Sequence, residues 1–447
     1  MTTLSAYFFK AQELAGEELL GRSVPLSSLT ATTAVSSSQL AFGGNSEQKY
    51  AQKWMWRYDT TTTADKVRFS DSFAPATGTL THSGASWSDT TATDEDMFIL
   101  PEWLEPYRAR TAVHLAVQQV REWDETIIPV VRGQEWHWLH ELDWIQDAAS
   151  IRDIFWNYCP VITRNRYLQK RHTVNSSGVL TPDFWTVTDN ADTTPFTVTD
   201  YRGQKWAYRL ERAAGNDASL EQVVSAQRTG VSGDFPSGQT ITAVAVCAPT
   251  NAGDLDVYGG GGSSSASSTG SGAGFQEISA ESTLAAVDLE IYNGITAQAT
   301  NAGHLIYELY ACIGELTDQI RRDNFPRYML HDYKFEQGGP LKIHNPHVGS
   351  PGQLIICSER PFPGFDATRL GTGAADADES DAPLVPVAVG TVAILLEQHL
   401  GKTHPESMAW RRKFESAILK HLAYPTEGGH GKKMLNPPFA AAAMRVR

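Results

Sequence analysis

The acidic run at residues 376–381 is the densest group of potential metal ligands in the sequence. It carries four carboxylates in six residues, a set of oxygen donors that suits a hard cation. However, no glycine stands at the turn position that an EF-hand loop requires, and an apolar helical pattern follows directly. The sequence therefore favours a solvated acidic segment that caps this helix, and we expect no metal and no cofactor.

The cysteines and histidines lack the spacing of a metal site or a disulfide framework. His137 and His140 lie among tryptophans, but no carboxylate-histidine motif accompanies them, so we expect them to pack at a helix interface. The cysteines form no CxxC pattern, so reduced and buried thiols are expected. They are Cys159, Cys247, Cys312 and Cys357.

Catalytic motifs do not occur in the sequence. There is no GxSxG, HExxH or P-loop pattern, and no GxGxxG pattern follows a predicted strand. A glycosidase needs two carboxylates at a fixed separation on a rigid scaffold, whereas the carboxylates here lie mainly on expected polar helix faces and turns. We therefore expect no catalytic residues and a protein that is not an enzyme.

Composition and charge exclude several classes of protein. The 447 residues include 51 acidic and 37 basic side chains, which gives a formal charge of -14. This charge argues against a surface that neutralises nucleic-acid phosphates across its whole extent. The first residues have no signal-peptide pattern, and no run of about 18 uncharged apolar residues occurs, so neither secretion by a signal peptide nor a membrane span is expected.

Residues 1–103 are rich in Thr, Ser, Asp and Gly and contain only short apolar runs. Such a segment lacks the apolar mass for a domain, so we expect an extended arm that is ordered only against the remaining chain or a neighbouring subunit. The aromatic cluster at 54–58 fits two structures equally well. It is either a docking point for a neighbour or a short strand on the chain's own core.

Residues 104–168 and 313–425 have the pattern of a helical unit. Helices are expected from about 104 to 120, after 133, briefly near 313–320, from about 384 to 400, and from about 405 to 422. A short β pair is expected at 341–344 and 353–357.

Residues 169–312 alternate apolar and polar side chains with a period of two. Segments such as 184–188, 206–210 and 240–246 are separated by turns, which is typical of an antiparallel sandwich. The Gly- and Ser-rich stretch 259–271 is expected to be a long mobile loop. Helical parts on both sides predict an α+β multidomain fold, in which a helical host unit carries an inserted antiparallel β-sandwich.

The inserted sandwich resembles the jelly-roll domains of carbohydrate-binding modules. The resemblance rests on the order of a strand at Trp185, the run 201–210, the segments 218–222 and 237–243, and the strand 287–292. In that family an aromatic face stacks on sugar rings, which implies glycan stacking by Trp206, Tyr208 and Tyr258. The alternative is that Trp185 and Trp206 belong to the core of the sandwich.

The C-terminal third is similar to the head-to-tail connector (adaptor or neck) proteins of tailed bacteriophages. The similarity rests on residues 360–363 (RPFP), the acidic segment that ends at 383, and the apolar helix 387–397. It implies a homo-oligomeric ring, dodecameric in this family, that contacts the portal protein and tail or neck proteins. Double-stranded DNA would pass it without sequence specificity. The resemblance also implies synthesis in the host cytoplasm and a place in the virion neck.

Residues 426–447 are locally basic and rich in Gly and Pro, so they are not expected to fold alone. Two roles are open: a disordered solubilising end, or a tail that docks into an acidic cleft of the portal ring. The docking hypothesis uses Lys432, Lys433, Arg445 and Arg447 for orientation, with Phe439 and Met444 as apolar anchors.

These patterns favour a virion structural protein, the connector subunit between portal and tail. The alternative from another class is a host-glycan-binding adhesin or tail-fibre component, in which the sandwich is the functional part and the helices anchor it. A carbohydrate-degrading enzyme with a binding module is the least favoured of the three.

Overall fold

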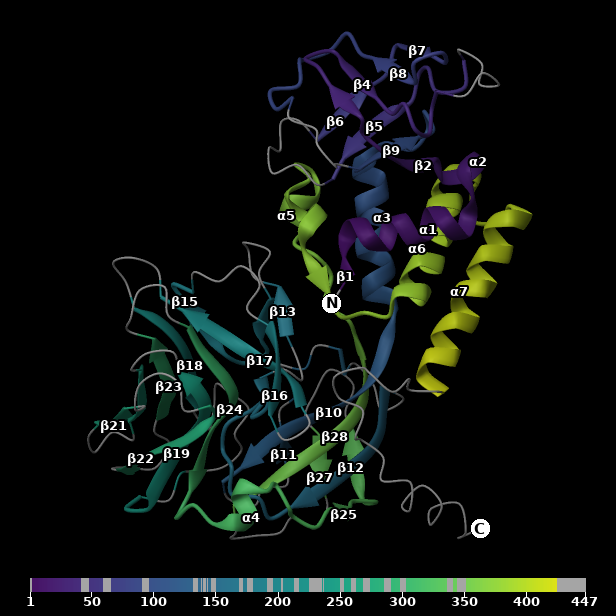
Figure 1. The fold of residues 1–447 in the computed structure, drawn as a ribbon. Helices are drawn as coiled ribbons and strands as arrows, with labels where there is room; N and C mark the ends of the chain where they lie inside the picture. Colours follow the sequence, from purple (N-terminus) through teal and green to yellow (C-terminus); the bar gives the residue numbers. More distant parts are fainter. Residues whose placement is uncertain are drawn as a thin grey trace. The chain divides into compact units, whose positions relative to one another are not determined.

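The computed structural model consists of two compact units (Figure 1). Unit 1 comprises residues 1–122, 174–178 and 361–426, and unit 2 comprises 123–173, 179–360 and 427–447. The structure describes residues 2–423 except 42–47, 59–65, 91–95, 132–135, 138, 140–141, 143, 146–149, 169–171, 175–179, 191–195, 202–203, 213–216, 225–234, 236, 250–252, 259–262, 268–273, 285–290, 298–302, 336–340 and 344–350.

Unit 1 has a helical core. Its helices are α1 (Leu4–Ala15), α2 (Glu17–Leu20), α3 (Pro106–Gln119), α5 (Ala367–Leu370), α6 (Leu384–Leu400) and α7 (Pro405–Ala423), with a 3-10 turn at Ala374–Ala377. Ala109, Ala112 and Val113 of α3 are fully buried because they share one helical face. The predicted helices near 104–120, 384–400 and 405–422 are therefore confirmed.

The described part of the first hundred residues is folded into helices and two sheets, so the prediction of an extended arm is wrong there. One sheet has the order β2 (Arg22–Pro25), β9 (Asp96–Leu100), β5 (Trp54–Arg57), β6 (Val67–Phe69), and a second has the order β3 (Ser28–Leu29), β4 (Thr33–Val35), β8 (Thr79–Thr81), β7 (Ser72–Ala74). Val24, Met55 and Met97 lie in a common buried cluster. Each apolar run is short, but the strands bring the runs together into one core.

The aromatic cluster at 54–58 forms β5, so it is a strand on the chain's own core. Trp56 is fully buried and packs against Phe8 and Phe98, with ring centroids 5.3 and 5.0 Å away. The chain terminus is held to the acidic segment, since β1 (Thr2–Thr3) pairs antiparallel with β29 (Glu379–Ser380).

Unit 2 begins and ends in one antiparallel sheet. Its strand order is β10 (Arg121–Val130), β28 (Gly352–Pro361), β12 (Ile151–Asn157), β25 (Tyr328–Met329). The chain thus enters through β10 and leaves through the neighbouring β28, which is why an insertion is tolerated here. The boundaries at 123 and 360 enclose more than the predicted 169–312 insert.

Several local predictions for unit 2 need correction. The helix expected after residue 133 is replaced, within the described residues, by strands β11 (Trp136–His137) and β12. A short apolar run is compatible with the period of a helix or of a strand. Pairing with the buried strand β28 makes residues 151–157 a strand. The expected β pair does not form, because β27 (Leu341–Ile343) pairs with β11 and β26 (Tyr333–Phe335). Near 313–320 only α4 (Asp318–Arg321) is helical.

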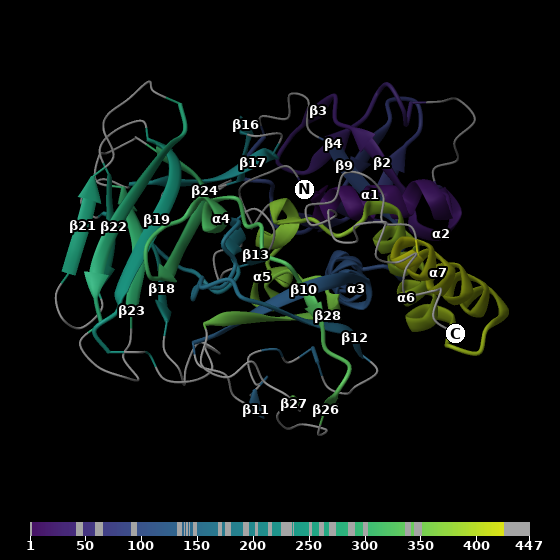
Figure 2. The same ribbon diagram turned by 90° about the horizontal axis from the view of Figure 1, so that it is seen from below.

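The predicted antiparallel sandwich is confirmed in two five-stranded sheets (Figure 2). The first sheet is β15 (Thr186–Thr188), β18 (Ala218–Val224), β23 (Ile291–Ala297), β20 (Gly253–Tyr258), β21 (Ser263–Ser267). The second is β16 (Phe196–Tyr201), β17 (Gln204–Glu211), β24 (Gly303–Ile313), β19 (Thr240–Pro249), β22 (Gln276–Thr283). Before β15 in the chain, β13 (His172–Val174) and β14 (Leu180–Pro182) form a separate two-stranded sheet. Part of the expected 259–271 loop is strand β21, which pairs with β20.

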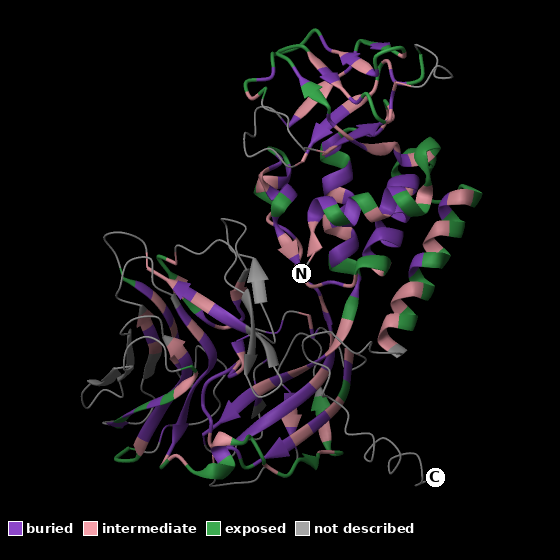
Figure 3. Ribbon diagram, in the orientation of Figure 1, coloured by how far each residue is buried: buried purple, intermediate pink, exposed green. Residues whose placement is uncertain are grey.

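Buried residues form the interior of each unit (Figure 3). All four cysteines are free thiols; Cys159, Cys247 and Cys312 are buried and Cys357 is half-buried. Burial raises the pKa of these thiols to about 12, which keeps them protonated. In the part of the chain that the structure describes, no helix is long and apolar enough to span a membrane.

Candidate functional site

Two exposed tyrosines lie together at the edge of the four-stranded sheet of unit 2. Tyr158 directly follows β12, and Tyr328 belongs to the edge strand β25, where it is the register partner of Trp156. Tyr158 and Tyr328 are 39% and 47% exposed, and Met329 is 40% exposed. The tyrosine ring centroids are 5.8 Å apart at an interplanar angle of 74°. We call Tyr158, Tyr328 and Met329 the tyrosine patch.

A polar cleft of unit 2 lies beside this patch, because the chain neighbours Cys159 and Arg327 line it. We define the polar cleft by Glu125, Ile127, Cys159, Val161, Thr163, Arg164, Asn165, Arg166, Tyr167, Phe184, Asp323, Arg327 and Gln353. Its cavity volume of about 80 Å³ is well below the roughly 300 Å³ at which small-molecule pockets begin. A larger ligand must therefore lie across the cleft rather than inside it.

The side chains of the cleft carry planar polar groups. The Arg327 guanidinium donates to the Glu125 carboxylate at 2.8 Å, at the rim that adjoins Tyr328. The Tyr167 hydroxyl donates to Asp323 Oδ2 at 3.5 Å. The Asn165 amide donates to the carbonyl of Asp183 at 3.0 Å. Planar amide, guanidinium and carboxylate groups beside exposed aromatic rings suit ligands with many hydroxyls.

A buried ion pair anchors the floor of the cleft. The Arg166 guanidinium lies 2.6 Å from Glu308 Oε2 and donates to the carbonyls of Ile320 and Arg321 at 2.6 and 2.9 Å. It also lies 3.9 Å from the centre of the Tyr310 ring. Glu308 raises the pKa of Arg166, although burial alone would lower it. The pair ties the cleft to strand β24 of the sandwich.

Two residues of the cleft have strained backbones. Asn165 and Phe184 have φ values of +50° and +66°, in the left-handed region that non-glycine residues rarely adopt. Surrounding bonds hold this geometry, since the Trp185 indole donates to the Asn165 carbonyl at 3.1 Å and the Gln222 amide donates to that of Phe184 at 2.9 Å. Strain that the surroundings hold in place is frequent at ligand sites.

Of the predicted stacking residues, only Tyr208 has a described side chain. Tyr208 is fully buried in the sandwich, where its hydroxyl accepts a hydrogen bond from Asn190 at 3.1 Å, so no face of its ring is open to a sugar. Trp185 is 5% exposed, as the core interpretation predicted. Trp206 and Tyr258 lie in β17 and β20, but their side chains are outside the described residues.

Of the other residues singled out in the sequence, some are described by the structure and some are not. The basic tail with Lys432, Lys433, Phe439, Met444, Arg445 and Arg447 lies outside the described residues. His137 lies 1% exposed in β11 rather than on a helix, and His140 is not described. The tyrosine patch was missed because no sequence signal marks it: its two halves are 170 residues apart and meet only through β12 and β25.

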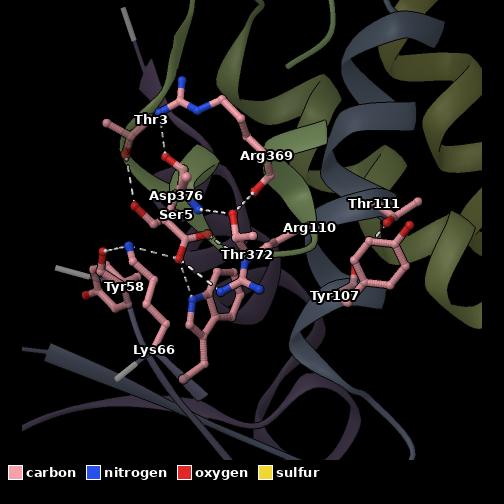
Figure 4. A network of polar contacts seen from close by, with 12 residues as sticks. Thr3, Ser5, Tyr58, Lys66, Tyr107, Arg110, Thr111, Arg369, Thr372 and Asp376 are labelled. Carbon is pink, nitrogen blue, oxygen red and sulfur yellow. Dashed lines mark hydrogen bonds and ion pairs between the residues drawn. The ribbon is translucent and has the colours of Figure 1, made fainter. Parts of the chain in front are cut away.

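Two carboxylates of the acidic run, those of Asp376 and Asp378, are buried rather than solvated, whereas Glu379 and Asp381 are half-buried. Asp376 is fully buried, and its carboxylate accepts hydrogen bonds from Arg110 Nε at 2.6 Å and from the Trp56 indole at 2.9 Å (Figure 4). The Lys66 ammonium lies 3.3 Å from the same carboxylate. The prediction of a solvated helix cap is therefore wrong for Asp376, because Arg110 and Lys66 from distant segments neutralise its carboxylate. Among the described residues no group of three or more His, Cys, Asp or Glu is placed to hold a metal.

Asp378 of the same run is only 6% exposed and lies 2.9 Å from the Arg369 guanidinium. Burial raises the pKa of this carboxyl to about 7, and the neighbouring carboxylates of Asp366 and Asp376 add to the rise. Arg369 opposes the rise, but it does not outweigh burial. Folded unit 1 therefore retains a proton that the unfolded chain releases near pH 4.

This proton makes unit 1 less stable as the pH rises. Between about pH 4 and 7 unfolding releases the proton of Asp378, so the free energy of unfolding falls with pH and levels off above 7. Relative to an Asp378→Asn variant, the native protein should lose about 2 kcal/mol more between pH 5 and 7.5. Denaturant unfolding at both pH values measures this difference. An identical pH dependence in the two proteins would exclude Asp378 as the titrating group.

Neither family models nor the sequences of curated proteins give a match to this chain. Solved structures do show similarity over about a third of it. The tailspike protein 4 domain of bacteriophage CBA120 is 11% identical, with 34% of this chain and 21% of that chain covered and a TM-score of 0.26. This chain thus spans about a fifth of that domain's length.

Two carbohydrate-binding modules are similar over the same share of the chain. TmCBM61, solved with β-1,4-galactotriose, is 14% identical, with coverage of 34% and 98% and a TM-score of 0.24. The CBM22-1 xylan-binding domain of Paenibacillus barcinonensis Xyn10C is 12% identical, with coverage of 34% and 94% and a TM-score of 0.23. At these TM-scores the similarity assigns neither a family nor a function.

Proposed function

We propose that unit 2 binds glycan chains at the tyrosine patch, with the polar cleft as a subsite for one protruding sugar substituent. The observation that carries this proposal is the pair of exposed tyrosines, 5.8 Å apart, at the rim of a cleft of planar polar groups. The apolar face of a pyranose gains by covering an aromatic ring, while its hydroxyls bond to neighbouring amides and carboxylates. The shallow cleft favours an extended chain that lies across it.

The proposal takes up the adhesin or tail-fibre alternative rather than the connector role. The apolar helix that suggested a connector is α6, whose residues 387–396 are all buried in unit 1. Asp376 of the acidic run is likewise buried against Arg110. Packing in unit 1 therefore accounts for the composition of these motifs without a ring, a portal protein or passing DNA. Attachment of a virion to a glycan-coated surface is the role that we assign to the binding.

We also propose that binding occurs without catalysis. The Glu125 carboxylate accepts a hydrogen bond from Arg327 at the rim, and the Asp323 carboxylate accepts one from the Tyr167 hydroxyl. A glycosidase needs one carboxyl group that is free to protonate the leaving oxygen, whereas both of these carboxylates are already engaged by side chains of the cleft. Incubation with β-1,4-galactan oligosaccharides, xylohexaose or polygalacturonate should release no reducing ends. Release that depends on Glu125 or Asp323 would contradict this proposal.

Replacement of both tyrosines should weaken glycan binding strongly. Loss of two stacking rings should weaken binding by at least tenfold in a Tyr158→Ala/Tyr328→Ala variant. Isothermal titration of the full chain measures the effect, with β-1,4-galactan oligosaccharides, xylohexaose and polygalacturonate as probes. A Tyr158→Phe/Tyr328→Phe variant should keep most of the affinity, because stacking needs the ring and not the hydroxyl.

A matched control separates stacking from general loss of surface aromatics. Tyr107 on α3 of unit 1 is 48% exposed, so Tyr107→Ala removes a comparable ring away from the patch. This variant should bind as tightly as the native protein. If the double alanine variant binds every probe as the native protein does, or if no probe binds the native protein, the proposed site is wrong.

A further inference from the structure

Unit 1 contains a second cavity, distinct from the polar cleft, into which basic side chains converge. Its volume is about 290 Å³, close to the roughly 300 Å³ at which ligand pockets begin. It lies between α2, the start of β2, the turn before β5 and the end of β9. We call it the basic cavity and define it by Glu17, Glu18, Gly21, Arg22, Lys49, Tyr50, Lys53, Ile99, Leu100 and Pro101.

Three cations and two carboxylates line the basic cavity, an excess of positive charge on a protein of net charge -14. Arg22 Nη1 and Lys49 Nζ lie 3.7 and 3.8 Å from the Glu17 carboxylate, too far for direct hydrogen bonds. The short bond to Glu17 comes from the Tyr50 hydroxyl at 2.6 Å. The Glu17 carboxylate thus makes its short hydrogen bond with Tyr50 and not with either cation.

Lys53 adds a third positive charge to the cavity. Its ammonium makes no hydrogen bond or ion pair within the residues that the structure describes. A guanidinium and two ammonium groups around one space are the groups with which proteins recognise carboxylate and phosphate oxygens. Ile99 and Leu100 supply an apolar wall beside them.

The turn that carries the two lysines is held rigidly. Buried Ser70 donates from its hydroxyl to the Tyr50 carbonyl at 2.9 Å and accepts from the Lys53 amide at 2.9 Å. The backbone carbonyl of Ser70 accepts a hydrogen bond from the backbone N–H of Gln52 at 2.9 Å. Gln52 is kept at a φ of +56°, a strained geometry for a non-glycine residue. The turn thus presents Lys49, Tyr50 and Lys53 to the cavity in a preformed arrangement.

The opposite wall is fixed by the close approach of two backbones. Gly21 has a φ of +77°, and a Cβ there would lie 1.9 Å from the carbonyl oxygen of Ile99. Only glycine allows β2 to begin at this distance from β9, and Arg22 follows directly in β2. Arg22 Nη2 donates to Gln39 at 2.6 Å, which orients the guanidinium.

We propose that the basic cavity is a binding site for a small ligand with a carboxylate or phosphate group. The anion lies between Arg22, Lys49 and Lys53, and the apolar wall of Ile99 and Leu100 contacts the remainder of the ligand. This site is independent of the glycan site, because it uses residues of unit 1 only. Glu17 limits the affinity, because its charge competes with the ligand for the same cations.

Isothermal titration of the full chain with inorganic phosphate, D-galacturonate and neutral D-galactose tests the site. We expect binding of at least one anion and none of galactose. Binding of galacturonate alone identifies a carboxylate ligand, and binding of phosphate alone identifies a phosphate ligand. A Lys49→Ala/Lys53→Ala variant should lose at least tenfold in affinity, whereas Lys402→Ala/Lys420→Ala, which removes the same charge from exposed positions of unit 1, should not.

A Glu17→Gln variant provides a test that misfolding cannot mimic. The amide oxygen of glutamine still accepts the Tyr50 hydroxyl, but the competing negative charge is gone, so anion affinity should rise several-fold and become more sensitive to salt. Equal or weaker anion binding by Glu17→Gln overturns the proposal. So does the failure of every anion to bind the native protein, or equal binding of galactose and galacturonate.

Discussion

Replacement of Arg110 by methionine should destabilise unit 1 by about 3–5 kcal/mol, the usual cost of removing one partner of a buried ion pair. Arg110 is 1% exposed, donates through Nε and Nη2 to Asp376 at 2.6 and 3.0 Å, and lies 4.8 Å from the centre of the Trp56 ring. Without it, the fully buried Asp376 carboxylate faces Lys66 alone among the cations within 4 Å in the described residues. Denaturant unfolding measures the loss, and hydrogen exchange should locate it in α3 and α6.

Two further variants show that the effect belongs to the charge pair. Arg108→Met changes an exposed arginine of the same helix and should cost less than about 1 kcal/mol. An Arg110→Met/Asp376→Leu variant should recover a large part of the stability, since no charge is then left buried without its partner. A loss below 1 kcal/mol in Arg110→Met, or no recovery in the double variant, would show that the pair does not hold unit 1 together.

In unit 2, Arg166→Met should cost a similar 3–5 kcal/mol, because it removes the ion-pair partner of the buried Glu308. It also removes the donors that reach the carbonyls of Ile320 and Arg321. The loss of donors frees α4 from the floor of the cleft. Hydrogen exchange should therefore increase in β24 and α4, while α3 and α6 of unit 1 stay protected.

Arg321 provides the matched control for Arg166. It pairs with Glu277 at 2.9 Å, but the two side chains are 41% and 34% exposed, so water screens the pair. Arg321→Met should lower the free energy of unfolding by no more than about 1 kcal/mol. Equal losses in the two variants would mean that burial does not determine the strength of these pairs.

Periodicity in the sequence was sufficient to predict helices α3, α6 and α7 and the strands of the sandwich. The helical spacing of Ala109, Ala112 and Val113 predicts α3, and the all-apolar run of α6 predicts a buried helix. The period of two over residues 169–312 predicts the sandwich strands. These signals are local, because each helix or strand must present its own apolar face to a core.

The same local signals failed where long-range pairing decides the structure. The short strands of the first hundred residues have little apolar surface each, and only their assembly into two sheets makes a core. Residues 151–157 fit a helix or a strand, and their pairing with β28, about 200 residues later, selects the strand.

The sequence by itself predicted helices α3, α6 and α7 of unit 1, the antiparallel sandwich and the free thiols of this protein. Tertiary structure alone decided that Asp376 is neutralised by Arg110, that Tyr208 is buried, and that Tyr158 and Tyr328 form an exposed patch. The reason is physical: the burial, charge and exposure of a side chain depend on which distant segment lies against it, and pairing between strands far apart in the chain sets that neighbour.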